Sequence, residues 1–274
     1  MVKPEKIRQP VVAGKFYPSS SRDLKEQIGS FLSKDAEKSD VIACMLPHAG
    51  YAYSGAVAGE TLSRVKIKDR VILLGPNHTG YGPKYSIMPE GVWQTPLGET
   101  AIDSEFAGEI LNRCKYLEAD DAAHAYEHSL EVELPFLQYS KNDLKIVPII
   151  FMSDEPGPLK EIGKDIAGYI LGRDIKDRSL IIASSDMTHY EPQAQAEKKD
   201  KEAIKAILEL DEDMLIDRVR RLNISMCGYA PVITMISAAK SLGAKTAELI
   251  KYQTSGDVSG DKSSVVGYAG IIVY

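Results

Sequence analysis

Short apolar runs alternate with segments of helical periodicity along most of this 274-residue chain. Four runs rich in Val, Ile and Leu have the length of buried strands and lie at residues 41–46, 70–75, 144–151 and 179–184. Helical patterns predict helices at residues 54–64, 104–113, 159–171, 194–210, 213–222 and 231–242. This alternation is typical of α/β proteins, in which helices carry the chain back between strands.

Two later parts of the pattern modify this picture. Residues 247–254 and 265–274 are predicted to form a closing pair of strands, and residues 86–89 and 91–100 a shorter strand insertion. The sheet is therefore expected to be mostly parallel or mixed, within a three-layer α/β/α sandwich. Because no Pro- or Ser-rich linker is longer than residues 153–158, residues 1–274 are expected to form a single domain.

Composition and charge exclude several classes of protein. A net charge of -6, with Lys interleaved among Asp and Glu, offers no basic surface for nucleic acid or an anionic membrane. No apolar stretch approaches the roughly 20 residues of a membrane span, and residues 1–10 lack the apolar core of a signal peptide. Three cysteines, Cys44, Cys114 and Cys227, are too few for a disulfide framework. These features predict a cytoplasmic protein.

The candidate chemistry gathers around the histidines. All five stand in short segments with Pro, Gly, Asp or Glu: His48, His78, His124, His128 and His189. His48, His78 and His189 each follow a predicted strand, and α/β proteins bind ligands outside the carboxyl ends of their strands. One such histidine could simply belong to a turn in which Gly50 or Gly80 adopts a positive φ. Three together favour one site.

A metal centre is the first interpretation of that site. Neutral imidazole, carboxylate and thiolate bind metals with different preferences. His48 and His78 are the predicted first two ligands, and the third is Cys227, His189 or Asp186. Two histidines with a carboxylate suit Fe(II), whereas histidines with a cysteine also suit copper or zinc.

The cysteines differ in their surroundings. Cys44 lies within a predicted strand and is expected to pack as a small hydrophobe. Cys227 precedes Gly228 and a helix with Pro231 at its start, where backbone N–H groups can lower the pKa of a thiol. The alternative for Cys227 is a buried structural thiol in a loop.

Asp186 and His189 are three residues apart and would share one face of a helical turn. Asp186 could then orient the imidazole or stabilise its charge, which makes His189 the candidate general base. In the alternative interpretation Asp186, Ser184 or Ser185 caps a helix and His189 is a bystander.

Residues 124–128, His-Ala-Tyr-Glu-His, fit the H-x-x-E-H pattern of inverted zinc peptidases. In that pattern two histidines on one helix, here His124 and His128, bind zinc, and the glutamate, here Glu127, activates water. Residues 129–135 fit the periods of both helix and strand. In a second interpretation Glu127 and His128 line the pocket made by the other loops.

Several strings, in order along the chain, resemble the MEMO family. They are AGKFYP at residues 13–18, PHAGYAYSG at 47–55, GPNH at 75–78, EHS at 127–129, SSDMTH at 184–189 and MCG at 226–228. The resemblance covers nearly the whole chain and ends in SSVVGYAG at residues 263–270. It implies a fold similar to class III extradiol dioxygenases, α/β sandwiches that hold non-haem Fe(II) by two His and a Glu and use a further His as acid/base.

The resemblance also implies roles for single residues. His48 and His78 match the two histidine ligands, and His189 matches the acid/base histidine. Cys227 falls where the dioxygenase carboxylate would be and is implied as the third ligand of iron or copper. Because a thiolate shifts metal preference toward copper or zinc, ring cleavage does not follow from this likeness.

Asp186 and Tyr53 match other pocket positions, and Phe16 stands where some relatives carry a Trp at the pocket wall. Three functions are then in competition. The first is a redox enzyme resembling dioxygenases, with Fe(II) or copper and with zinc as a further option, acting on an unknown small substrate.

The second function is a non-catalytic adaptor, as eukaryotic relatives are described, that captures metal or a peptide between tyrosine walls. The residues suggested for those walls are Tyr51, Tyr53, Tyr81 and Tyr229. The third is the zinc peptidase. The resemblance further suggests that prokaryotic members act alongside a radical-SAM protein.

Overall fold

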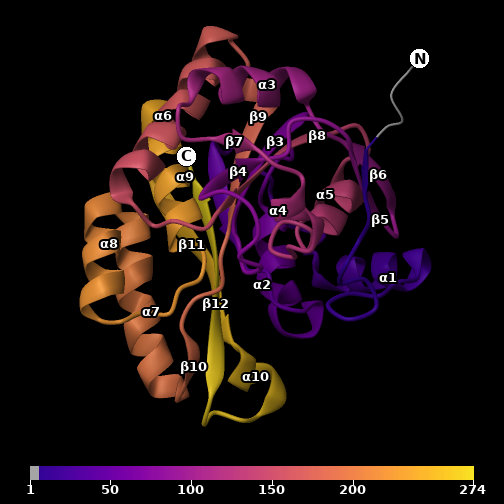
Figure 1. Cartoon of the computed structure of the whole chain (residues 1–274). Coiled ribbons are helices and arrows are strands. Elements are labelled where there is room, and N and C mark those ends of the chain that lie inside the picture. The colour runs from indigo at the N-terminus through magenta and orange to yellow at the C-terminus, as the bar shows by residue number, and fades with distance from the viewer. Residues whose placement is uncertain (1–5) are drawn as a thin grey trace.

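The computed structural model describes residues 6–274, and its centre is a mixed β-sheet (Figure 1). Within these residues the strand order is β10-β12-β2-β9-β3-β8-β4-β7, and β11 pairs with β12. The strands are β2 (Ala43–Leu46), β3 (Arg70–Pro76), β4 (Tyr85–Ile87), β7 (Glu118–Ala119), β8 (Lys145–Phe151), β9 (Ser179–Ser184), β10 (His189–Glu191), β11 (Ala247–Thr254) and β12 (Val265–Val273).

Four adjacent strands, β2, β9, β3 and β8, run parallel at the centre of the sheet. They coincide with the four predicted apolar runs, and nearly all their residues are buried, which explains why polar residues do not alternate along them. The strands β12 and β4 pair antiparallel with β2 and β8, so the sheet is mixed, as predicted. β11 and β12 form the predicted closing pair.

Helices cover both faces of the sheet. The six predicted helices are confirmed as α2 (Tyr51–Ser63), α3 (Ser104–Arg113), α6 (Pro156–Gly172), α7 (Gln193–Leu208), α8 (Glu212–Arg221) and α9 (Tyr229–Ser241). Within residues 6–274 the structure contains four further α-helices that were not predicted: α1 (Ser21–Phe31), α4 (Ala122–Ala125), α5 (Leu134–Ser140) and α10 (Ser255–Ser259). α2 packs on one face with α1 and α5, and α3 and α6 to α9 form the opposite layer, which completes the three-layer sandwich.

A smaller sheet contains β1 (Ile7–Arg8), β5 (Val92–Thr95) and β6 (Gly98–Ala101). The predicted strand insertion is therefore divided between the two sheets. Its first part is β4 of the main sheet, and its second part is the antiparallel hairpin of β5 and β6. Gly98 begins β6 with a φ of 130°, a conformation that glycine adopts without steric cost.

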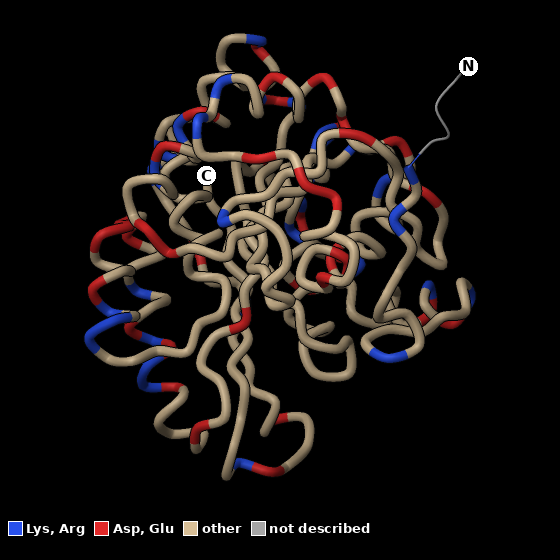
Figure 2. Tube along the Cα trace, in the orientation of Figure 1, with Lys and Arg blue, Asp and Glu red and all other residues tan. Residues whose placement is uncertain are grey.

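The surface carries charges of both signs. Figure 2 shows acidic and basic positions interleaved along the outer helices and loops, with both signs present on α7 and α8. Within residues 6–274 no helix combines the length and the apolar character that a membrane crossing requires. The prediction about a signal peptide concerns residues 1–10, of which residues 1–5 lie outside the described part.

Candidate metal centre

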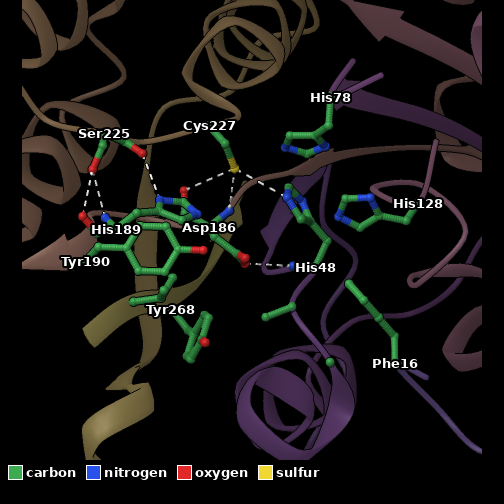
Figure 3. Close-up of a pocket in the computed structure, with 13 residues that line it drawn as sticks. Phe16, His48, His78, His128, Asp186, His189, Tyr190, Ser225, Cys227 and Tyr268 are labelled. Atoms are coloured by element: carbon green, nitrogen blue, oxygen red, sulfur yellow. Dashed lines mark hydrogen bonds between the residues drawn. The ribbon is translucent and has the colours of Figure 1, made fainter. Parts of the chain in front are cut away.

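A pocket of about 480 Å³ lies beyond the carboxyl ends of β2, β3 and β9. This is the sheet edge at which the sequence predicts a site. Its walls come from segments far apart in the chain, and Figure 3 shows them around one space. The lining residues are Phe16, His48, Ala49, Gly50, His78, His128, Asp186, His189, Tyr190, Ser225, Cys227, Val266 and Tyr268.

Three potential metal donors meet in this pocket. The donor atoms of His48, His78 and Cys227 lie within 4.8 Å of one another. His48 Nε2 is 3.3 Å from Cys227 Sγ. His48 follows β2, His78 follows β3, and Cys227 precedes α9, so the fold brings the three predicted ligands together (Figure 3).

Glu127 holds the His78 ring through its Nδ1 atom. Its Oε1 is 2.9 Å from His78 Nδ1, and the backbone N–H of His78 donates to its other oxygen. Glu127 is buried and is not one of the lining residues within residues 6–274, so it holds a pocket residue in place without itself forming the wall. Burial acts to raise the pKa of Glu127, but hydrogen bonding to His78 and the charges of His78 and His128 outweigh it and lower the pKa to about 2.

Ser184 supports His48. Its Oγ is 2.8 Å from His48 Nδ1, while Nε2 on the far side of the ring faces Cys227. Burial lowers the pKa of His48 well below its ordinary value, and the neighbouring His78 and His128 act in the same direction. His48 is therefore neutral at pH 7, the state in which imidazole binds a metal.

A second set of donors consists of His78, Glu127 and His128, whose ligand atoms also lie within 4.8 Å of one another. In this set Glu127 already accepts the backbone N–H groups of His78, His128 and Ser129. The His128 ring is stacked on His78 with centroids 4.7 Å apart. Because the carboxylate is already engaged, the set with Cys227 is the better fit for a metal.

His189 stands across the pocket from His78 and His128 (Figure 3). The prediction that Asp186 and His189 share a helical turn is wrong, because residues 185–188 are irregular and His189 begins β10. The Ser225 carbonyl lies 2.8 Å from His189 Nδ1 and orients the ring. A carbonyl only accepts, so Nδ1 carries the proton and Nε2 the lone pair of a neutral ring.

Asp186 has a different partner from the one predicted. Its carboxylate accepts the backbone N–H of His48 at 2.9 Å. Burial raises the pKa of Asp186 to about 6, although the charge of His189 acts to lower it. Asp186 thus links the loop after β9 to the loop after β2, and it acts on His189 through charge.

Cys227 is half-buried at the pocket wall. Burial raises the pKa of its thiol, contrary to the predicted lowering, although the Asp186 N–H does donate to Sγ at 3.3 Å. Gly228 permits this placement, because a Cβ there would collide with the Ser184 carbonyl oxygen. Cys44 is buried within β2, as predicted.

His124 lies away from the pocket. α4 ends at Ala125, so the prediction that His124 and His128 share a zinc-binding helix is wrong. His124 is buried beside Trp93, with ring centroids 6.0 Å apart. No candidate metal group within residues 6–274 includes His124. The zinc peptidase interpretation therefore loses its pair of ligands.

Aromatic side chains form part of the pocket wall, but most are not the predicted ones. Phe16 lines the pocket as predicted, and its ring lies edge-on to His128 at 5.0 Å. Tyr190 and Tyr268 are the tyrosines of the wall. Among residues 6–274, the lining does not include the four tyrosines suggested from the sequence: Tyr51 is buried, Tyr53 and Tyr81 are exposed, and Tyr229 bonds Asp154.

Some residues at the site had weak signals in the sequence. Tyr190 follows His189 directly, and Ser225 stands two residues before Cys227, so neighbourhood to a predicted site residue is the signal for both. Glu133 lies in an apolar run, where a carboxylate indicates burial with a specific partner. That partner is Ser184, which the sequence pattern suggested only as a helix cap.

Comparisons with known proteins show similarity over nearly the whole chain. A family model described as Memo-like protein matches residues 8–272. A MEMO1 family protein of Methanocaldococcus jannaschii is 45% identical over 98% of this chain and 99% of its own length. One of Methanopyrus kandleri is 43% identical over 97% of this chain and 98% of its own.

One solved structure supports the fold. The crystal structure of an uncharacterized protein from Escherichia coli K12 matches with a TM-score of 0.53 and 12% identity. The match covers 83% of this chain and 98% of that one. At this identity the likeness concerns the fold alone.

Proposed function

Because the chain belongs to the Memo-like protein family, we propose that it is a redox protein that holds Fe(II) or copper on His48, His78 and Cys227 and acts on a small molecule. One observation carries this proposal: three side chains from separate loops direct their donor atoms into one pocket, within 4.8 Å of one another. Two imidazoles and a thiolate would leave coordination positions open for a substrate. Zinc is the third candidate metal.

The donor set is suited to a transition metal. His78 has Nδ1 engaged by Glu127 and His48 has Nδ1 engaged by Ser184, so each ring has Nε2 left for a ligand bond. Histidines that bind metals almost always have their second ring nitrogen held in this way. Sulfur and imidazole nitrogen together favour iron, copper or zinc over magnesium or calcium, which prefer oxygen ligands.

When bound, the metal would supply Lewis-acid and one-electron redox chemistry. The chain itself supplies proton transfer. His189 keeps its Nδ1–H on the Ser225 carbonyl, so the lone pair on Nε2 can accept a proton from a substrate in the pocket.

The pocket wall limits what the substrate can be. A volume of about 480 Å³ admits a small organic molecule. Tyr190, Tyr268 and Phe16 offer flat surfaces that would hold an apolar or aromatic part of such a molecule and exclude water around it. Burial raises the pKa of Tyr268, so its hydroxyl stays protonated and able to donate.

We also propose that the protein is cytoplasmic. Cys44, Cys114 and Cys227 are all free thiols, which is the usual state of cysteine in a reducing compartment.

Metal analysis of anaerobically purified protein tests the proposal. The wild type should contain near-stoichiometric iron or copper, and His48→Ala, His78→Ala and Cys227→Ala should each lose most of it. His189→Asn should keep its metal, because His189 is not among the three donors.

A folded wild type without metal, after reconstitution with Fe(II) or Cu, would contradict the proposal. Metal retained, with no turnover of any of the small molecules screened, would favour the adaptor instead. Circular dichroism of each variant separates loss of metal from loss of fold.

A further inference from the structure

A buried hydrogen-bond cluster lies behind His48, on the side of the ring away from the pocket. Ser184 Oγ is at its centre, 2.8 Å from His48 Nδ1, 2.8 Å from Glu133 Oε1 and 2.7 Å from the Ser129 carbonyl oxygen. All three distances are those of hydrogen bonds. Ser184, Ser129 and Glu133 have no solvent exposure, so their polar groups must find hydrogen-bond partners within the protein.

The protons of this cluster can be counted. A serine hydroxyl donates one hydrogen bond and accepts two. The Ser129 carbonyl can only accept, so it receives the single proton of the Ser184 hydroxyl. The other two partners must then donate to Ser184 Oγ: His48 through Nδ1–H, and Glu133 through a protonated carboxyl group.

The surroundings of Glu133 agree with that count. Within residues 6–274 its carboxyl group has one hydrogen-bond partner, Ser184, and its Oε2 has none. An ionised carboxylate with a single hydrogen bond and no neighbouring cation would be costly at a fully buried position. Burial, together with the charge of Asp186, also raises the pKa of Glu133 well above its ordinary value.

We infer that Glu133 is a neutral positioning residue, which acts through Ser184 to hold His48 as the Nδ1–H tautomer with Nε2 free for the metal. The inference rests on the proposed function as far as the metal is concerned, whereas the tautomer and the proton on Glu133 can be observed without any metal. The segment from Glu127 to Glu133 then supports both histidine ligands, His78 directly and His48 through Ser184.

Spectroscopy of the metal-free protein tests the proton count. In protein labelled with ¹⁵N-histidine, ring-nitrogen correlations should show the Nδ1–H tautomer for His48 in the wild type. Glu133→Gln should keep that tautomer, because the glutamine NH₂ also donates to Ser184 Oγ, and Ser184→Ala should give a mixture. The infrared band of a protonated carboxyl group should be present in the wild type and lost in Glu133→Gln. An Nε2–H tautomer in the wild type, or a carboxyl band unaffected by Glu133→Gln, would overturn the inference.

Titration with Co²⁺ tests the link to the metal. Ser184→Ala should bind Co²⁺ about 10-fold more weakly than the wild type, at the lower end of the range for residues that orient a metal-binding histidine. Glu133→Gln should bind as the wild type does. Ser237→Ala is the matched control and should bind as the wild type does, because its buried hydroxyl donates to the Lys160 carbonyl, outside the pocket and the cluster at Ser184.

The possible outcomes separate the two proposals. If the wild type binds no Co²⁺, the proposed function fails, and the tautomer measurement still decides the role of Glu133. If the wild type binds Co²⁺ and Ser184→Ala binds it equally well, the inference fails and the proposed function stands.

Discussion

The two sides of the pocket hold their histidines in different ways. On the inner side, His48 and His78 extend from the ends of parallel strands, and each ring is held by a buried side chain. On the outer side, His189 belongs to the short strand β10, and a backbone carbonyl, that of Ser225, holds its ring. The inner side is thus built to keep donor atoms in place, and the outer side to stay within reach of solvent and substrate.

Irregular backbone is found on the outer side. Tyr190, next to His189, has a φ of 58° and is 78% exposed. For a residue other than glycine this conformation costs about 1–2 kcal/mol. The register of β10 against β12 also shifts between His189 and Glu191. Such irregularities redirect side chains near functional sites, and here His189 and Tyr190 both line the pocket.

The largest effect on Co²⁺ affinity is expected from Glu127→Gln, on the inner side of the pocket. The substitution removes the charge facing His78 and replaces an accepting oxygen with an NH₂ group, so Co²⁺ affinity should fall about 10–100-fold. A spectroscopic titration measures it. Glu155→Gln, an exposed carboxylate paired with Lys84, is the control and should bind as the wild type does. Unchanged affinity in Glu127→Gln would mean that the inner side does not depend on its buried carboxylate.

The sequence predicts the inner side better than the outer one. Parallel buried strands leave long apolar runs, and their carboxyl ends meet at one edge, so the pattern of apolar residues is enough to predict that His48 and His78 lie together. The partners of these rings could not be predicted, because Ser184 is 136 positions from His48 and Glu127 is 49 positions from His78, and they meet only after the sheet has formed.

The local sequence pattern gave a wrong prediction where buried polar groups determine the backbone conformation. The H-x-x-E-H pattern predicts a helix, but Glu127 accepts backbone N–H groups of His78, His128 and Ser129, and the chain leaves the helix at Ala125 to allow this. A helix propensity of a few tenths of a kcal/mol per residue is smaller than the cost of leaving such buried groups without partners.

A smaller effect is expected from Asp200→Ala, which removes the anchor of the outer side. Asp200 Oδ1 accepts the Thr188 N–H at 2.9 Å, and Oδ2 accepts the Tyr252 hydroxyl at 2.7 Å. Leaving these groups unsatisfied should lower the free energy of unfolding by about 1–3 kcal/mol, measured by urea denaturation. Co²⁺ affinity should change little, since within residues 6–274 no hydrogen bond joins Asp200 to any of the three donors.

Asp213→Ala is the control for that variant. Asp213 forms an exposed ion pair with Lys160, which contributes about 0–1 kcal/mol. If Asp200→Ala weakened Co²⁺ binding as much as Glu127→Gln, the two sides of the pocket would be coupled and the proposed division between them would be incorrect.

The smallest effect is expected from Tyr190→Gly. Glycine adopts a positive φ without steric cost, but it also gives the unfolded chain more freedom, and these opposing contributions of about 1 kcal/mol each should nearly cancel. Thermal unfolding and Co²⁺ affinity should both stay close to the wild type. Asp174→Gly, at a φ of 52° outside the pocket, is the matched control for the backbone. A loss of several kcal/mol in Tyr190→Gly but not in Asp174→Gly would show that the Tyr190 ring is packed into the fold, and the outer side would then be as firmly built as the inner one.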